Sequence, residues 1–293
     1  MKKSILTFVF AAIIAVMSIN VNAQTFVLQG INTPVANLSS SDANDTICVG
    51  DAVMFTAAPS AGSSYQFFVN GVSVQGPVAS NNYVPTAPWA AGSYEVAVRL
   101  HNGSCPAFDT IQFAVLSSPV PTLVSDAPGN VACAGDSVTF TATGGSNYNF
   151  RVGASAATAT SVQNGTSPTY TTSTLTSGQV VVVDVTNAGG CSATSLPITM
   201  TIHSLPTVAT VTGNVGAPEC VGTDAAVDLT GLTGLAPWSF EVYEDVAGNP
   251  GALYYTVPGT VVNPNPTINV PVPANGFTTL HLRIIDGNGC STF

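Results

Sequence analysis

The chain has 293 residues, of which 45% are hydrophobic and only 7% are charged, and it contains 27 glycines and 20 prolines. This composition excludes a coiled coil, a nucleic-acid-binding surface and a disordered segment dominated by charge. Two of the five basic residues lie in a segment that we expect to be removed, which leaves 3 arginines against 15 acidic residues, a formal charge of −12 and no lysine. Such a surface repels phosphate backbones and anionic membranes, so we expect a neutral, cationic or saccharide partner.

Residues 1–23 have the organisation of a secretory signal peptide. Two lysines precede an apolar run at residues 5–17, and residues 21–23 supply the small side chains that a signal peptidase requires. The run is shorter than the roughly 20 residues that span a bilayer. We therefore expect cleavage before Gln24, secretion, and no membrane insertion of the mature chain.

A cysteine motif organises the rest of the sequence into repeats. Cys48, Cys133 and Cys220 each open a Cys-x-Gly stretch, 85 and 87 residues apart, and a second cysteine follows a glycine-rich turn in each repeat, at Cys105, Cys191 and Cys290. Repeats of this length with short strands between turns are typical of small β-sandwiches. The pattern predicts a first repeat at 24–118, which includes a short N-terminal segment, a second at 119–205 and a third at 206–293.

Two strands with apolar residues at alternate positions recur in each repeat. The first is predicted at 65–69, 148–152 and 238–242, and the second at 96–100, 181–185 and 280–284. Side chains at alternate positions point to one face of a strand, so these residues should form the core. We interpret the strands as C and F of an immunoglobulin-like sandwich, which lie side by side and antiparallel. The predicted fold class is all-β, with tandem immunoglobulin-like sandwiches.

The outward positions of these two strands carry all three arginines of the mature chain. Equivalent positions pair Phe68 with Arg99, Arg151 with Asp184, and Glu241 with Arg283. Each pair would contribute about 0.2–1 kcal/mol. We therefore predict a structural role for these arginines and not a role in ligand binding.

Six cysteines in a secreted chain predict three disulfides. One pair per repeat gives Cys48–Cys105, Cys133–Cys191 and Cys220–Cys290, each contributing roughly 4 kcal/mol. A standard sandwich, however, places the two cysteines of a repeat at opposite ends. The alternative joins neighbouring repeats through Cys48–Cys191 and Cys133–Cys290. We favour pairing within repeats, because the alternative leaves Cys105 without a partner in the first repeat.

The motif Cys-x-Gly-Asp-x-Val-x-Phe-Thr-Ala at 48–57 and 133–142, an aromatic strand that ends in Asn70-Gly71, and the closing turn before a cysteine carry a resemblance. They resemble the Ig-like and PKD-like repeats of large secreted surface proteins of gliding, polysaccharide-degrading Bacteroidota. The resemblance implies a spacer or adhesive module at the outer surface of a Gram-negative cell, exported by type IX secretion. An extracellular glycan or protein surface would be its partner.

A strand follows the closing cysteine of the first and second repeats, at 110–116 and 196–202, whereas the sequence ends three residues after Cys290. We expect the third repeat to lack its last strand. We interpret this as the truncation of a longer surface protein. The alternative is that a strand from another molecule fills the gap, as in donor-strand pilins.

Two kinds of carbohydrate contact are also predicted. The resemblance implies O-glycosylation at Asp-Ser/Thr-apolar triplets, which places candidate sites at Thr46, Thr110 and Ser137. Sugars stack on exposed rings, so Trp89, Tyr254 and Tyr255 are candidate ligand residues of an alternative function, a carbohydrate-binding module array. A binding module would cluster these rings with carboxylates on an open face, and a spacer would bury them.

The sequence offers little for catalysis. It has no motif of a zinc protease, a serine hydrolase or a phosphate-binding loop, and His101, His203 and His281 are not at metal-ligand spacing. We expect no enzyme activity, no cofactor, no metal and no nucleic-acid partner.

Overall fold

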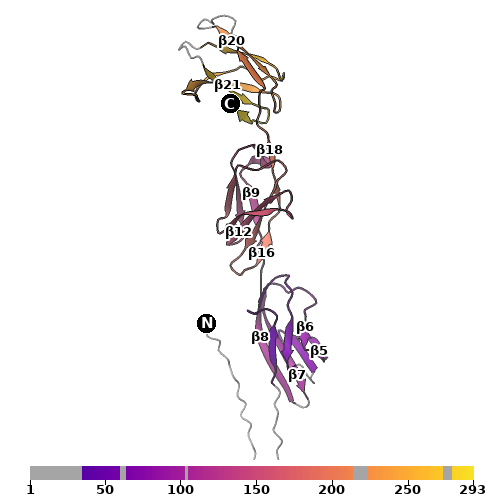
Figure 1. Cartoon of the computed structure of the whole chain (residues 1–293). Coiled ribbons are helices and arrows are strands. Elements are labelled where there is room, and N and C mark those ends of the chain that lie inside the picture. The colour runs from indigo at the N-terminus through magenta and orange to yellow at the C-terminus, as the bar shows by residue number, and fades with distance from the viewer. Residues whose placement is uncertain (1–34, 60–63, 103–104, 214–222, 273–278) are drawn as a thin grey trace, which may run out of the picture. The chain divides into compact units, whose positions relative to one another are not determined.

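The computed structural model describes residues 35–59, 64–102, 105–213, 223–272 and 279–293 (Figure 1). Within these residues the regular structure consists of β-strands and one 3-10 turn, η1, at Pro128–Asn130. The predicted signal peptide and Cys220 lie outside the described residues, as does the side chain of Cys105. The chain divides into two compact units. Unit 1 comprises Met1–Ser39, Phe55–Tyr83 and Glu95–Ile111, and unit 2 comprises Ser40–Met54, Val84–Tyr94 and Gln112–Phe293.

Most strands of the first sequence repeat belong to unit 1. The repeat contains two sheets, with strand orders β1-β3-β6 and β2-β8-β7-β4-β5. Inside unit 1 the ring of Tyr83 links these sheets, because it stacks at 6.2 Å on Phe55 and at 5.7 Å on Phe67. The strands are β1 (Asn37–Ser40), β2 (Thr46–Cys48), β3 (Phe55–Ala58), β4 (Ser64–Val69), β5 (Val72–Val78), β6 (Asn82–Tyr83), β7 (Gly92–Asn102) and β8 (Cys105–Leu116).

The second repeat lies wholly in unit 2 and has the same core. Its sheets have the orders β14-β11-β9 and β13-β12-β15-β16, with β17 also on β15, and β10 pairs with β18. Tyr170 stacks on Phe140 at 6.2 Å and lies tilted against Phe150 at 5.7 Å, and both phenylalanines are fully buried. The strands are β9 (Thr122–Ser125), β10 (Val131–Cys133), β11 (Val138–Thr143), β12 (Asn147–Gly153), β13 (Thr160–Gly165), β14 (Thr169–Thr172), β15 (Val180–Thr186), β16 (Ser192–Thr194), β17 (Ile198–Thr199) and β18 (Thr201–His203).

The third repeat, also in unit 2, has sheets of order β19-β20-β23 and β22-β21-β24-β25. Trp238, Phe240 and Ile284 are buried in its core, and the Trp238 indole Nε1 donates to the carbonyl oxygen of Thr233 at 2.9 Å. The strands are β19 (Thr210–Gly213), β20 (Asp224–Thr230), β21 (Ser239–Val246), β22 (Asn249–Thr256), β23 (Thr267–Pro271), β24 (Leu280–Ile285) and β25 (Ser291–Thr292).

The predicted antiparallel pairing of strands C and F is confirmed in all three repeats. β4 pairs with β7, β12 with β15, and β21 with β24, each antiparallel. The apolar residues face each other in register, for example Phe67 opposite Val98 and Phe150 opposite Val183. Strict alternation produces this result, because period-2 patterning fixes which side chains enter the core.

The last strand differs between repeats. β8 is 12 residues long in the first repeat, and in the second the strand is divided into β16, β17 and β18. In the third repeat β25, of two residues, pairs with Ile284 and Ile285 of β24, as β16 pairs with β15 in the second repeat. The strand predicted at 196–202 corresponds to β17 and β18, so the absence of its counterpart in the third repeat stays a prediction.

Candidate functional site

The cysteine motif folds as a tight turn. In the first repeat the Asp51 amide donates to the Cys48 carbonyl oxygen at 3.0 Å, and Gly50 adopts a φ of 95°. A type II turn requires a positive φ at its third residue, which favours glycine there. The carboxylate oxygen Oδ2 of Asp51 accepts a hydrogen bond from the Cys48 amide at 3.2 Å. The glycine and the aspartate of the motif therefore hold the cysteine backbone in place.

The second repeat uses the same turn at Cys133. Its Asp136 amide donates to the Cys133 carbonyl oxygen at 3.0 Å, the Asp136 carboxylate accepts from the Cys133 amide at 3.0 Å, and Gly135 has a φ of 89°. In both repeats the strand that ends at the cysteine runs parallel to the end of the last strand. Cys48 lies opposite Leu116, and Cys133 lies opposite His203. In these two repeats the first cysteine is thus held where the chain leaves the repeat.

The second cysteine follows a closing turn that one polar side chain organises. In the second repeat the Asn187 side-chain oxygen accepts from the amides of Gly189 and Cys191, each at 3.0 Å. In the third repeat Asp286 accepts from the amides of Asn288 at 3.0 Å and Cys290 at 2.9 Å. Asn and Asp favour such turns because their side chains bond to backbone groups a few residues on.

The closing turn of the second repeat meets the exit of the first. The side-chain amide of Asn187 donates to the Ser117 carbonyl oxygen at 2.9 Å, just after β8. Gly189 lies so close to Leu116 that an added Cβ would be 2.7 Å from the leucine side chain. Both contacts lie within unit 2. They bring the end of β8 and the closing turn of the second repeat together.

Two disulfides join successive repeats. Cys48 bonds to Cys191, with Cα atoms 5.6 Å apart, and Cys133 bonds to Cys290, with Cα atoms 5.5 Å apart. All four cysteines belong to unit 2. The predicted pairing within repeats, Cys48–Cys105 and Cys133–Cys191, is therefore wrong. The predicted Cys220–Cys290 pair is wrong too, because Cys290 bonds to Cys133.

The physical reason for this correction is the position of the two turns. The first cysteine of a repeat lies beside the end of the last strand, where the chain passes to the next repeat. The closing turn of that next repeat contacts the chain just after this strand. In a standard sandwich the two cysteines of a single repeat lie at opposite ends, too far apart to form a disulfide. This geometry determines the pairing, and the need to give Cys105 a partner within the first repeat does not.

Two of the predicted cross-strand pairs form ion pairs in the structure. Arg151 Nη2 donates to Asp184 Oδ1 at 2.9 Å, and its Nε lies 2.7 Å from Oδ2. Arg283 Nη1 donates to Glu241 Oε2 at 3.0 Å. Burial raises the pKa of Asp184, but hydrogen bonds from Arg151, Thr194 and Asn149 and the charge of Arg151 outweigh it, so this pKa lies below its usual value.

The third predicted pair, Phe68 with Arg99, is wrong. Arg99 of β7 lies opposite Gln66 of β4, and Phe68 lies opposite Ala97. The Arg99 guanidinium lies 5.6 Å from the ring centroid of Phe108 on β8. A cation–π contact is present, but with an aromatic residue of the other neighbouring strand.

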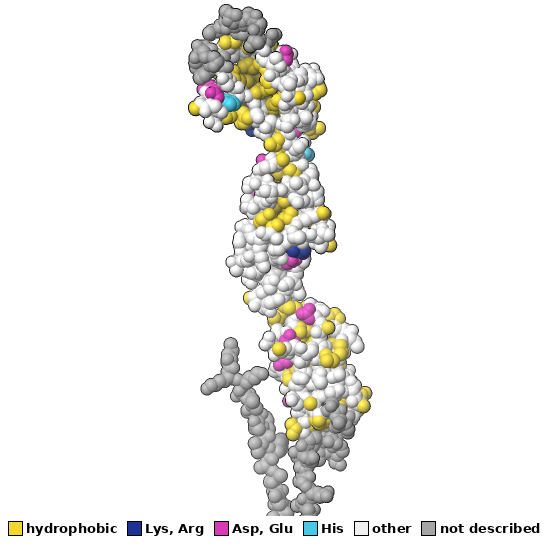
Figure 2. All heavy atoms as spheres, in the orientation of Figure 1, with side chains coloured by type: hydrophobic (Ala, Val, Ile, Leu, Met, Phe, Trp, Pro, Cys, Tyr) yellow, Lys and Arg dark blue, Asp and Glu magenta, His cyan; other side chains and the backbone are white. Residues whose placement is uncertain are grey.

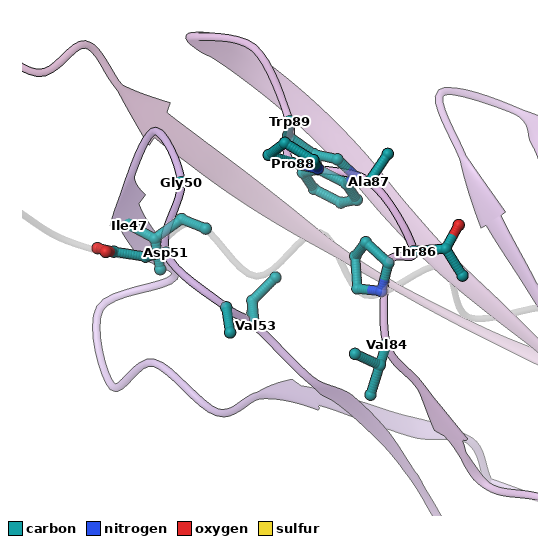
Figure 3. Close-up of a pocket in the computed structure, with 11 residues that line it drawn as sticks. Ile47, Gly50, Asp51, Val53, Val84, Thr86, Ala87, Pro88 and Trp89 are labelled. Carbon is teal, nitrogen blue, oxygen red and sulfur yellow. The ribbon is translucent and has the colours of Figure 1, made fainter.

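Trp89 lines an open pocket of about 300 Å³ in unit 2 (Figure 3). Ile47, Val53, Val84 and Pro88 contribute apolar surface to it, and in the view of Figure 3 the Asp51 carboxylate points away from the indole. The indole is half-buried and packs at 4.6 Å on Tyr94 and edge-on at 5.6 Å on Phe113. The pocket therefore provides an apolar floor with few polar groups.

The other candidate ligand rings pack against the core. Tyr254 and Tyr255 of β22 are partly buried and pack against the core of the third repeat. The Tyr254 hydroxyl donates to the Pro271 carbonyl oxygen at 3.1 Å. Rings that pack in this way are expected of a spacer.

The candidate glycosylation and histidine residues are dispersed. Thr110 and Ser137 are exposed, and Thr46 is half-buried on β2. His281 Nε2 lies 2.7 Å from Asp245 Oδ1, and this contact lowers the pKa of Asp245. Among the described residues no group of three or more His, Cys, Asp or Glu side chains is arranged to hold a metal ion. No helix among them is long and apolar enough to cross a membrane.

No protein-family model matches the sequence, and no curated protein matches it. Solved structures with a similar arrangement include fibronectin(III)-like modules of CbhA from Clostridium thermocellum, with 14% identity over 57% of this chain and 93% of that one, at a TM-score of 0.36. A three-Ig segment of titin has 10% identity over 84% of this chain and 92% of its own, at 0.40. Three N-terminal domains of the bacteriophage RB49 capsid protein Hoc have 10% identity over 88% and 96%, at 0.36.

The sheet orders and registers define the fold class. Each repeat has two main sheets that enclose one core, and strands C and F are central in one of them. The chain is all-β and consists of tandem immunoglobulin-like sandwiches.

Proposed function

We propose that the chain is a non-catalytic structural segment of an extracellular adhesive protein, and that its disulfides limit how far it extends under load. The observation that carries the proposal is that both disulfides join one repeat to the next. Disulfides of this kind persist in oxidising compartments, which supports secretion. In this proposal, which the resemblance noted in the sequence supports, the segment would lie at the surface of a gliding bacterium and would space or attach an adhesive part.

The two disulfides interleave along the sequence, and this has a mechanical consequence. If every repeat unfolds under tension, the shortest covalent path from Cys48 to Cys290 crosses the first disulfide to Cys191, follows the chain back to Cys133 and crosses the second disulfide. That path has about 58 residues, or roughly 200 Å at 3.5 Å per residue. Without disulfides the path has about 242 residues, or roughly 850 Å. The cross-links therefore remove about three quarters of the extension.

Either disulfide alone preserves most of this limit. With only Cys48–Cys191 the shortest path is about 99 residues, and with only Cys133–Cys290 it is about 85 residues, near 3.5 Å each when extended. If the cysteines paired within repeats, each disulfide would shorten only the path through its own repeat. In the interleaved arrangement the extension stays limited when one of the two disulfides is lost, which suits a segment under tension.

Single-molecule stretching of the mature chain, held at its two ends, tests the proposal. We expect the oxidised chain to release roughly 200 Å between Cys48 and Cys290, and roughly 850 Å after reduction. The Cys48→Ala/Cys191→Ala variant should release roughly 300 Å, and the variant with all four cysteines replaced should behave as the reduced chain. Equal release before and after reduction would contradict the proposal.

Carbohydrate binding is a second candidate function, favoured by the pocket at Trp89. A half-buried indole over an apolar floor offers a surface on which a neutral sugar can stack. Titration of the Trp238→Phe variant with neutral oligosaccharides, followed by the fluorescence of Trp89, tests this function. We expect a saturable change that the Trp89→Phe variant lacks, and an unchanged signal at millimolar sugar would refute it.

A further inference from the structure

Basic residues are few in this chain, and the structure places them in strands. After the predicted signal peptide the sequence has three arginines and no lysine, where an average composition would give a chain of this length roughly 30 basic residues. In the view of Figure 2 basic side chains are correspondingly sparse beside acidic ones. The arginines lie in β7, β12 and β24. Proteases of the trypsin class cut after arginine and lysine, so every bond that they could cut after the signal peptide lies within a strand.

The bond after each arginine is protected by its sheet. β7 pairs with β8 and β4, β12 pairs with β13 and β15, and β24 pairs with β21 and, from Ile284 on, with β25. The residues that follow the arginines face the core, since Leu100 and Ile284 are buried and Val152 packs against the core of the second repeat. A protease binds its substrate as an extended segment, so the strand must first leave its sheet. Because these strands form the central C and F pairs, that step opens the repeat.

The guanidinium groups are also engaged within their own sheets. Arg151 and Arg283 form the ion pairs described above, and Arg99 lies over an aromatic ring of the neighbouring strand. Arg283 donates further hydrogen bonds from Nε and Nη2 to the Ser291 hydroxyl oxygen, at 3.1 and 2.9 Å. A trypsin-class protease takes the guanidinium into its specificity pocket, so each of these contacts has to break before the bond is cut.

The two disulfides enclose all three of these bonds. The Cys48–Cys191 loop contains the bonds after the first and second arginines, and the Cys133–Cys290 loop contains the bonds after the second and third. Because the loops overlap, every backbone bond from Cys48 to Cys290 lies inside at least one of them. Cuts after any one or two arginines therefore leave the chain covalently joined, and only cuts after all three separate it into two disulfide-linked pairs of fragments.

We propose that the folded segment resists extracellular proteases of the trypsin class and stays covalently joined when its backbone is cut. Cleavage of a folded protein follows the population of its opened state, which for a stable domain is about one molecule in a thousand or less. The inference rests on the extracellular location proposed above, where such proteases act, and not on the extension limit. Its failure would therefore leave the outcome of the stretching experiment unaffected.

Trypsin digestion of the oxidised mature chain in native buffer tests the resistance. On reducing gels we expect the full-length band to disappear at least a thousandfold more slowly than for the same chain unfolded in urea, which should be cut after all three arginines. The Thr166→Arg variant introduces a cleavable bond into the exposed connection between β13 and β14. It should be cut at least a hundredfold faster than the parent, and the matched Thr166→Gln variant should be as resistant as the parent.

The Thr166→Arg variant also tests the covalent joining, because position 166 lies inside both disulfide loops. After the cut, its two fragments should run as one species on a non-reducing denaturing gel and should separate only after reduction. When all four bonded cysteines are replaced as well, the fragments should separate without a reducing agent. The proposal is overturned if the parent is cut as fast as the Thr166→Arg variant, or if the cut variant separates in its oxidised form.

Discussion

Removal of the Cys133–Cys290 disulfide should strongly destabilise the third repeat. Cys133 lies beside His203 on β10 of the second repeat. When the third repeat unfolds and the second stays folded, the cross-link closes a loop that runs from about residue 203 to Cys290, or about 87 residues. The chain-entropy relation gives roughly 4.5 kcal/mol for such a loop. Small domains have a total stability of about 5–15 kcal/mol, so most of this repeat's stability is at stake.

Urea unfolding of the Cys133→Ala/Cys290→Ala variant, followed by tryptophan fluorescence, measures this loss. Trp238 is buried in the third repeat, and replacing Trp89 by Phe in both proteins leaves it as the only tryptophan. With a slope of about 1–1.5 kcal/mol per molar urea, the midpoint should fall by about 3–4.5 M.

The matched control removes the other disulfide. The Cys48→Ala/Cys191→Ala variant should leave the Trp238 transition within about 0.5 M urea of the parent, because its loop does not enclose the third repeat. If both double variants shifted the Trp238 transition equally, or neither did, the assignment of each disulfide to its own repeat would be refuted.

Three further predictions concern the second repeat. Phe150→Ala, at a fully buried site, should lower the free energy of unfolding by about 3–5 kcal/mol in chemical denaturation, and a loss below 1 kcal/mol would contradict the core assignment. Asp184→Asn should lower it by about 1–2 kcal/mol at pH 7. Because the folded pKa of Asp184 is lowered, its contribution is complete above 3.8 and is lost as the pH falls below that value, so parent and variant should converge in acid. Gly135→Ala, at a φ of 89°, should cost about 1–2 kcal/mol, whereas Gly76→Ala, which has open space and no positive φ, should cost less than 0.5 kcal/mol by the same measurement.

The sequence was sufficient to predict the fold, because the alternation of apolar residues that determines it is a local pattern. Alternating apolar residues determine which face of a strand is buried, and a one-residue slip would expose the whole set. The pairing of β12 with β15 therefore followed from the residues alone, with Phe150 opposite Val183.

Pairs that depend on the exact register could not be predicted as well. Arg283 lies directly opposite Glu241, whereas Arg99 lies opposite Gln66, two residues before the predicted Phe68. Two long charged side chains can still meet across this two-residue offset, as Arg151 does when it reaches Asp184 diagonally. Phe68 carries no charge that would attract Arg99 over the same distance.

The disulfide pairing depends on a contact between repeats, which a pattern within one repeat does not encode. The relevant signal was the placement of Cys48 and Cys191 in a standard sandwich, at the exit of one repeat and in the closing turn of the next. The side-chain contact of Asn187 with Ser117 had no sequence signal of its own.

A non-reducing peptide map tests the central claim most directly. Trypsin cuts the mature chain after its three arginines and places Cys48 and Cys290 in separate fragments, 24–99 and 284–293. We predict that 24–99 is linked to 152–283, which carries Cys191, and that 284–293 is linked to 100–151, which carries Cys133. Linkage of 24–99 to 100–151, or of 284–293 to 152–283, would mean pairing within repeats and would contradict the account.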